Sequence, residues 1–175
     1  MTTKARLKAF PPIVSPNVKV LILGSMPSAV SLADHQYYAH QRNHFWPIIN
    51  ALFGTDTKLC YADRCRSLND HHVALWDVIA RCTRRGSLDS DIIDESIEVN
   101  DFNTFFKQYT TIHSVFFNGG KAEQIYRKYI LPKLSGDLNM EYHRLPSSSP
   151  ANATWSLAEK LEAWQIVKQK ADIIS

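Results

Sequence analysis

Four short runs of apolar residues along the chain are typical of buried β-strands. The first covers residues 18–24, where aliphatic side chains follow one another almost without polar interruption and end in Gly24. Because polar residues do not alternate with apolar ones there, both faces of this strand are expected to be buried, as in a parallel sheet covered by helices. We predict that three further runs, at residues 73–76, 112–117 and 140–145, form the other strands of that sheet.

Apolar residues recur at helical spacing between and after these runs. One such segment covers residues 45–53 and is followed by Gly54, a residue type that commonly ends helices. A second segment covers residues 121–129 and stops before Pro132. A third begins at a Ser-x-x-Glu capping box at residues 156–159. The apolar positions of this third helix are Leu157, Leu161, Trp164 and Val167.

The alternation of strands and helices predicts an α/β fold, a three-layer α/β/α sandwich with a central, mostly parallel four-stranded sheet. No repeat or long linker divides the chain, so residues 1–175 are expected to form a single domain. In parallel sheets of this kind, ligands bind outside the carboxyl ends of the strands. We therefore expect functional residues in the loops that directly follow the strands.

Composition narrows the class of protein. The chain has 175 residues, of which 45% are hydrophobic and 21% charged, values that exclude disordered and collagen-like chains. No apolar run approaches the roughly 20 residues of a membrane span. The first residues also lack the apolar core of a secretory signal. The three cysteines are typical of a reduced protein, and no motif with four closely spaced metal ligands occurs. We expect a cytoplasmic protein without a membrane partner.

The formal net charge of the chain is +3. A mildly basic protein of this kind can bind an anionic partner, but the charge alone does not indicate one.

Two loops in the first third of the chain carry candidate contacts. The first follows the first strand, and there Gly24 lets the backbone approach a ligand closely, with Ser25 and Met26 behind it. An ordinary turn is the alternative. The second covers residues 36–46 and interleaves aromatic, amide and basic side chains, which suits base stacking and phosphate contact.

Within the second loop, we expect Tyr38 to stack on a base and Arg42 to contact phosphate. Asn43 precedes the helix of residues 45–53 and is a candidate both for its N-cap and for chemistry, roles that do not exclude each other. Phe45 and Trp46 are expected in the core beneath that helix.

Two later loops complete the set of candidates. Asn118 follows the third strand and offers an amide donor and acceptor to a base edge, although Asn-Gly is also a common turn. The loop of residues 145–153 holds Ser147, Ser148 and Ser149 between two prolines. Small hydroxyl groups in such a loop can donate to phosphate oxygens, and a polar connector is the alternative.

Taken together, these loops resemble the uracil-DNA glycosylase superfamily, and most of all its hypoxanthine-DNA glycosylase branch. Residues 38–46 are similar to the Phe-Ala-His-Pro-x-Asn-x-Phe-Trp segment of the mismatch-specific uracil-DNA glycosylases. Residues 75–79 and 86–90 resemble the hypoxanthine branch. The resemblance covers about residues 18–164. It implies a four-stranded parallel sheet between helices and DNA with a damaged or deaminated base as the partner.

The sequence departs from the superfamily pattern at two positions. Met26 stands where many members carry an Asp or Asn that orients the attacking water, and Leu145 stands where the last loop often begins with His or Asn. The resemblance to the hypoxanthine branch then implies that Asn43 is the catalytic residue. The backbone of Gly24 to Met26, together with the side chains of Tyr38 and Asn118, is expected to contact the base.

These features predict a monofunctional DNA glycosylase that hydrolyses the N-glycosidic bond of a deaminated base, chiefly hypoxanthine, in base excision repair. No cofactor and no metal are expected, and we expect a monomer. No lysine that could form an imine with DNA lies in the four loops before Lys121, and no Asp or Glu except Asp34, to which we assign no role. Three alternatives stay open: a glycosylase for uracil or G/U mismatches, a non-catalytic damaged-DNA-binding protein, and an enzyme that acts on free nucleosides.

Overall fold

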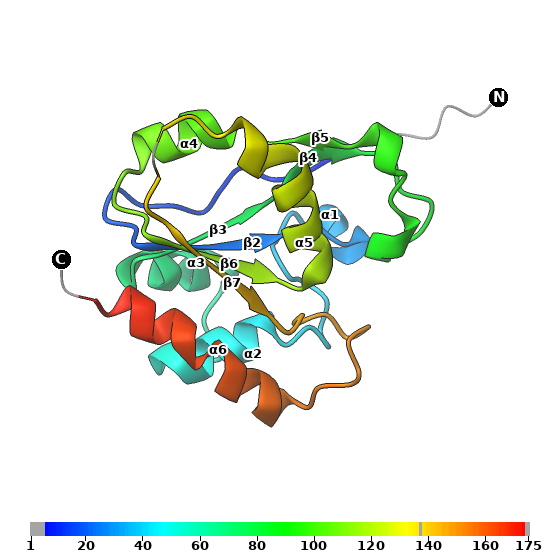
Figure 1. Ribbon diagram of the computed structural model, residues 1–175. Helices are drawn as coiled ribbons and strands as arrows, with labels where there is room; N and C mark the ends of the chain where they lie inside the picture. Colours follow the sequence, from blue (N-terminus) through cyan, green and yellow to red (C-terminus); the bar gives the residue numbers. More distant parts are fainter. Residues whose placement is uncertain (1–5, 137, 174–175) are drawn as a thin grey trace.

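A four-stranded sheet forms the centre of the protein (Figure 1). The computed structural model describes residues 6–136 and 138–173. The expectation that the chain begins without a secretory signal rests partly on residues 1–5, which lie outside the described residues. The strand order is β3-β2-β6-β7, and every neighbouring pair is parallel. The strands are β2 (Val20–Gly24), β3 (Val73–Asp77), β6 (Ser114–Asn118) and β7 (Glu141–Leu145). The predicted fold class and the four predicted strands are confirmed, with ends that differ by one or two residues.

Helices cover both faces of this sheet. One face carries α4 (Phe102–Gln108) and α5 (Gly120–Ile125), and the other carries α2 (Phe45–Phe53), α3 (Tyr61–Asp70) and α6 (Leu157–Ala171). Along β2, Leu21 and Leu23 pack into the cluster under α4 and α5, whereas Val20 and Ile22 pack into the cluster with α2 and α6. Burial on both faces explains why this strand has no polar alternation.

The predicted helices form, with differences at their ends. Helix α2 ends at Gly54, which has a φ of 67°, and Phe45 and Trp46 are buried as expected. Its N-cap residue is His44 rather than Asn43, although the Asn43 side chain still bonds the first turn. The second predicted helix divides into α5 and a π-helical turn at Tyr126–Ile130.

Helix α6 starts at the predicted capping box, in which Ser156 N donates to Glu159 Oε2 at 2.7 Å. Trp164 and Val167 are buried, as expected for its apolar face. Leu157 is 37% exposed, so its prediction as part of the apolar stripe is wrong. It occupies the first turn, which extends past the sheet toward solvent. None of the helices in the described residues is both long and apolar enough to cross a membrane.

A small antiparallel sheet was not predicted from the sequence. It consists of β1 (Leu7–Lys8), β4 (Ile79–Cys82) and β5 (Glu98–Val99), strands too short to give a clear hydrophobic pattern. Between β4 and β5 the chain makes two 3₁₀ turns, at Asp89–Asp91 and Asp94–Ser96. A short helix, α1 (Ala29–Asp34), follows β2. The first 3₁₀ turn and the segment that leads to α1 both reach the carboxyl end of the parallel sheet.

Candidate active site

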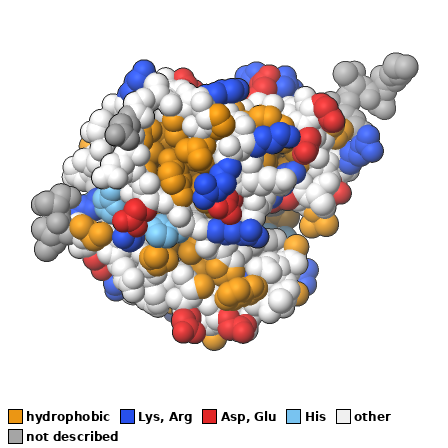
Figure 2. Space-filling model, viewed as in Figure 1, with side chains coloured by type: hydrophobic (Ala, Val, Ile, Leu, Met, Phe, Trp, Pro, Cys, Tyr) orange, Lys and Arg blue, Asp and Glu red, His pale blue; other side chains and the backbone are white. Residues whose placement is uncertain are grey.

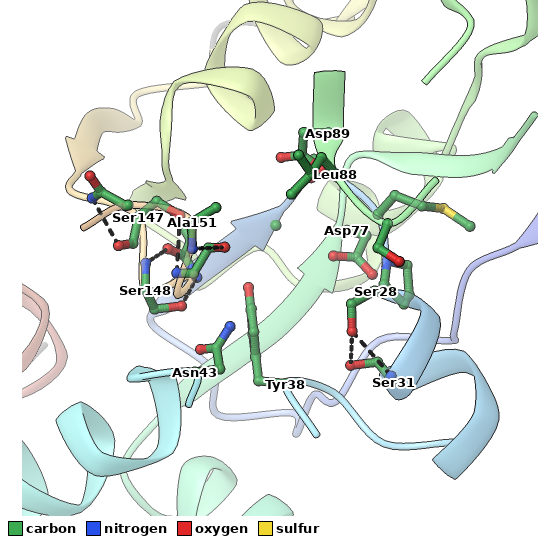
Figure 3. A pocket seen from close by; sticks show the side chains of 18 of the residues that line it. Ser28, Ser31, Tyr38, Asn43, Asp77, Leu88, Asp89, Ser147, Ser148 and Ala151 are labelled. Atoms are coloured by element: carbon green, nitrogen blue, oxygen red, sulfur yellow. Dashed lines mark hydrogen bonds between the residues drawn. The ribbon is translucent and has the colours of Figure 1, made fainter. Parts of the chain in front are cut away.

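A cavity of about 430 Å³ opens at the carboxyl ends of β2, β3 and β6 (Figure 3). Its walls come from the four predicted loops and from the segment between β4 and β5. All candidate residues named from the sequence line this cavity except Arg42. They are Gly24, Ser25, Met26, Tyr38, Asn43, Asn118, Ser147, Ser148 and Ser149.

The loop after β2 forms one side of the cavity. Gly24 lies where a Cβ atom would be 2.5 Å from Asp77 Oδ1 and 2.8 Å from Tyr38 Oη, so no larger residue fits without displacing these groups. Ser25 Oγ donates to Asp89 Oδ1 at 2.7 Å. Met26 lines the cavity but is buried in the hydrophobic cluster under α4 and α5, so most of its surface is taken up by the core.

Tyr38 forms an aromatic wall of the cavity. Its ring is stacked on Phe45, with ring centroids 4.1 Å apart and an interplanar angle of 20°. Its φ is 53°, in the left-handed region that bulky residues rarely adopt, and strain of this kind is concentrated at functional sites. The neighbouring Tyr37 is instead buried in the core, and its hydroxyl donates to Pro11 O at 3.0 Å. The ring face of Tyr38 away from Phe45 is the one available to a base.

The amide of Asn43 has a defined orientation. Its Oδ1 accepts a hydrogen bond from the backbone N–H of Phe45 at 2.9 Å, which assigns the oxygen and the nitrogen of the amide. The amide oxygen is therefore directed to the start of α2, and the N–H₂ group is the part of Asn43 left for the cavity. Figure 3 shows Asn43 beside Tyr38, with the Tyr38 hydroxyl directed into the cavity.

Asn118 and Ser148 form a reciprocal pair across the cavity wall. Asn118 Nδ2 donates to Ser148 Oγ at 2.8 Å, and Ser148 N donates to Asn118 Oδ1 at 2.8 Å. The carbonyl of Ser148 also accepts from His44 N at 2.9 Å. Ser148 is 0% exposed, so in this conformation it joins three loops and presents no surface to DNA. Asn118 keeps one amide hydrogen and one lone pair for other contacts.

The neighbouring serines are more accessible. Ser147 Oγ accepts from Ser149 N, and Ser149 Oγ accepts from Ala151 N, both at 3.2 Å. Each hydroxyl hydrogen is therefore left to donate outward. The close packing of this loop on β6 depends on Gly119, whose φ is 96° and where a Cβ would be 3.0 Å from Ser147 Cβ.

The cavity is also lined by two carboxyl groups that sequence reasoning did not assign to the site. Asp77 is the last residue of β3 and is 3% exposed, and Asp89 lies on the first 3₁₀ turn. Burial raises the pKa of Asp77 to about 8, and the Asp89 charge adds to the rise. The pKa of Asp89 is also raised by desolvation, although that residue keeps an exposed surface. Both residues lie in segments that resemble the hypoxanthine branch, and this resemblance was the sequence signal that could have assigned them to the site.

Arg42 lies outside the main cavity, at a shallower depression next to it. This depression is also lined by Trp155 and by Lys160 from α6. Lys160 is 1% exposed, with Nζ 3.4 Å from His44 Nδ1, and burial lowers its pKa. Sequence reasoning missed this lysine because it belongs to a helix, far along the chain from the loops. Among the described residues, no three His, Cys, Asp or Glu side chains come together as a metal site would require.

Comparisons with known proteins identify the family of this chain. The family model of the uracil DNA glycosylase superfamily matches residues 11–168. The chain is 35% identical over 161 residues to a hypoxanthine DNA glycosylase of Methanosarcina barkeri, covering 90% of this chain and 94% of the relative. It is equally similar to a hypoxanthine DNA glycosylase of Methanosarcina acetivorans, with 91% and 96% covered.

A solved structure has the same fold over almost the whole chain. It is a solution NMR structure of a Methanosarcina acetivorans protein provisionally described as a uracil DNA glycosylase. The two structures superpose with a TM-score of 0.80 at 31% sequence identity, covering 97% of this chain and 100% of the other. The family match, the relatives and the fold agree, and the chain belongs to the uracil DNA glycosylase superfamily.

Proposed function

We propose that this protein is a DNA glycosylase that hydrolyses the N-glycosidic bond of a deaminated purine, chiefly hypoxanthine, as the first step of base excision repair. The observation that carries the proposal is the joint position of Tyr38 and Asn43 at the cavity. An aromatic ring held on Phe45 stands beside an amide held by the backbone of the next helix. Such a pair provides a stacking surface for a flipped base and a fixed donor beside it.

The role of Asn43 follows from its orientation. Because its oxygen accepts from Phe45 N, Asn43 acts in the cavity as a hydrogen-bond donor. A donor can hold the oxygen of the attacking water or an acceptor atom of the departing base, where negative charge develops. In both cases the contact is already oriented before the substrate arrives, so little reorganisation is needed in the reaction.

The size of the cavity supports a purine. Ser25 is small, and most of the Met26 surface is buried in the core, so the loop after β2 places no polar side chain where other members hold a catalytic Asp or Asn. The cavity volume of about 430 Å³ lies in the usual range for small-molecule sites. The names of the two curated relatives support hypoxanthine as the base.

Contact with the DNA backbone is assigned to Arg42, Ser147 and Ser149. Arg42 is exposed, and the two serine hydroxyls can donate to phosphate oxygens. Ser148 supports this surface from beneath, through Asn118 and His44. On the face shown in Figure 2, Lys and Arg side chains are interspersed with acidic and apolar ones. Together with a formal net charge of only +3, this distribution favours a modest electrostatic attraction to DNA.

Base release from defined DNA duplexes tests the proposal. Oligonucleotides with one hypoxanthine, uracil, xanthine or ethenoadenine are incubated with excess protein, and free base is measured by mass spectrometry. We expect hypoxanthine to be released fastest, with an abasic site as the other product. Release from free nucleosides at a similar rate would instead indicate a nucleoside-processing enzyme. Tight binding without release of any base would indicate a damaged-DNA-binding protein.

Uracil is the second candidate substrate. The solved relative is described as a uracil DNA glycosylase, and uracil carries the same ring N–H beside a carbonyl as hypoxanthine. Faster release of uracil than of hypoxanthine in the same set of duplexes would favour this candidate, with the same residues in the same roles.

A further inference from the structure

Asp77, at the end of β3, places a carboxyl group with unused hydrogen-bonding capacity in the wall of the cavity. Only 3% of the residue surface is exposed, and Oδ2 has no hydrogen-bond partner in the described part of the chain. Buried polar atoms without partners are rare in folded proteins, because each one carries a desolvation penalty. Asp77 is one of the residues that line the cavity, so a bound ligand can supply the missing partner when the carboxyl group turns toward it.

The hydroxyl of Tyr38 is a second buried polar atom without a partner among the described residues. It approaches the same point as Asp77, because a Cβ on Gly24 would lie 2.5 Å from Asp77 Oδ1 and 2.8 Å from Tyr38 Oη. The missing side chain at position 24 therefore allows the two groups to converge. The position of Asp77 itself is well supported, since its carbonyl accepts from Asn100 Nδ2 at 2.8 Å.

The groups around Asp77 determine its charge. Its carboxyl is desolvated, which raises its pKa to about 8, and the Asp89 charge adds to that rise. The cations Arg84 and Lys121 act on Asp89, where they lower the pKa. At neutral pH Asp77 therefore keeps its proton and presents one O–H donor and one carbonyl acceptor. Burial raises the pKa of Tyr37, Tyr38 and Tyr61, and Asp77 adds to each rise, so these three phenols and Asp89 are the titratable groups close enough to interact with Asp77.

Asn118 is less available for the edge of the base than its sequence position suggests. Both functional groups of its amide are already bonded to Ser148. Asp77 has the same pairing capacity as an amide when it is neutral, and its Oδ2 has no hydrogen-bond partner among the described residues.

We propose that Asp77 acts as a neutral carboxylic acid that pairs with the ring N–H and carbonyl of the flipped base and is a catalytic residue. This inference rests on the proposed function. The Asp77 O–H donates to the carbonyl oxygen of the base, and the Asp77 carbonyl accepts from the ring N–H beside it. Hypoxanthine and uracil both have this edge.

The same contact lowers the reaction barrier. When the bond from the base to C1′ breaks, its electron pair moves onto the base, and the carbonyl oxygen becomes more negative. A donor fixed in the wall of the cavity stabilises this charge more than it stabilises the bound substrate. The proton stays on Asp77. Water adds to C1′ and loses one proton, and the departing base anion gains one, so the products are the neutral free base and an abasic sugar. An ionised Asp77 would instead face that oxygen with a second negative charge and oppose the reaction.

The test compares Asp77→Asn and Asp77→Ala with the wild type in single-turnover base release across the range of pH from about 6 to about 9.5. Asn keeps one donor and one acceptor at every pH, so we expect activity within about 10-fold of wild type at neutral pH. Ala removes both groups, and we expect a loss of about 100-fold or more, the usual scale for one oriented donor. Asp34→Asn, at an exposed position, is the matched control.

The pH profile separates this role from a structural one. Wild-type activity is expected to fall above a pH of about 8, by up to tenfold for each pH unit, as Asp77 ionises. The ring N–H of the substrate also titrates in the alkaline range, so the Asp77→Asn profile serves as the reference, and only its difference from wild type reports on Asp77. Circular dichroism and thermal melting establish that both variants fold.

Each outcome bears on one of the two proposals. Coincident wild-type and Asp77→Asn profiles, or a folded Asp77→Asn variant as inactive as Asp77→Ala, would overturn the neutral-acid role while the glycosylase activity stands. Full activity in a folded Asp77→Ala variant would overturn it too. Absence of base release by the wild-type protein from every duplex would contradict the proposed function itself.

Discussion

Asn118 and Ser148 satisfy each other in both directions, with two hydrogen bonds of 2.8 Å between an amide and the hydroxyl and backbone N–H of one serine. The pair fastens the serine loop to the end of β6. Through its carbonyl, Ser148 also holds His44 at the start of α2. Two loops that are about a hundred residues apart in the chain are thereby joined at one buried point.

Ser148→Ala is expected to destabilise the protein by about 1–3 kcal/mol, because it removes the buried hydroxyl that accepts from the partly buried Asn118 amide. Urea unfolding measures this change. Ser147→Ala is the matched control, since Ser147 is partly exposed and should change stability by less than about 0.5 kcal/mol. Equal effects of the two substitutions would show that the hydrogen bonds between Asn118 and Ser148 add no stability beyond that of an ordinary loop serine.

Asn43 can be tested with two substitutions that separate capping from chemistry. Asn43→Asp keeps an oxygen for Phe45 N and should retain stability, but it loses the N–H₂ donor. Asn43→Ala loses both and should cost about 1 kcal/mol of stability, the effect of a lost cap. We expect single-turnover base release to fall about 100-fold or more in both variants. A folded Asn43→Ala variant that cleaves at the wild-type rate would reduce Asn43 to a helix-capping residue.

The salt dependence of DNA binding reports on Arg42. Arg42 is exposed and makes no ion pair with a described residue. If it contacts a phosphate, Arg42→Gln should reduce the slope of log K against log salt by about 0.9. Fluorescence anisotropy over a salt series gives the slope. Lys107→Gln in α4, a helix that lines neither the cavity nor the depression beside it, should leave the slope unchanged, and an equal change in both variants would contradict a specific contact.

Burial of Asp77 predicts a pH-dependent stability. The pKa of its carboxyl rises from 3.8 to about 8 on folding, so between these values the folded state holds a proton that the unfolded state has lost. Stability should therefore fall as pH rises through this window, by about 1.4 kcal/mol for each pH unit from this group alone. Asp77→Asn removes this dependence, so its advantage over wild type in urea unfolding should grow from about pH 5 to about pH 8. A constant difference would contradict a neutral buried Asp77.

A monofunctional mechanism predicts that no imine forms with DNA. Borohydride added during the reaction should therefore trap no covalent adduct, and EDTA should leave base release unchanged. Lys160 makes the borohydride test informative, because burial lowers its pKa and it lines the depression beside Asn43. If wild type gives a covalent adduct and Lys160→Gln does not, the reaction proceeds through Lys160 and the hydrolytic mechanism is wrong.

The central sheet could be predicted because its strands are short and buried on both faces, which gives continuous apolar runs such as residues 20–23. The candidate loops followed, because polar or small residues directly after such runs gather at one edge of a parallel sheet. The small sheet of β1, β4 and β5 could not be predicted, since strands of two to four residues carry no reliable periodicity.

Asp77 was missed for a different reason. The apolar run of residues 73–76 predicts a strand that ends at Trp76, but the strand includes Asp77, and the register of the sheet places Asp77 beside Gly24. Only this register shows that the acidic residue after the apolar run belongs to the site. The position of Asp89 depends on the path of a loop between two very short strands, and the only sequence signal for it was the resemblance of residues 86–90 to the hypoxanthine branch.

The left-handed backbone of Tyr38 has a consequence for the order of events on DNA. With its ring already stacked on Phe45, the surface that receives the base exists before any encounter, and its unfavourable backbone geometry is sustained by the fold rather than by the ligand. Little protein ordering then remains to slow association. The slow conformational step is thereby transferred to the nucleic acid, and lesions in weakly stacked or mispaired surroundings should be found soonest.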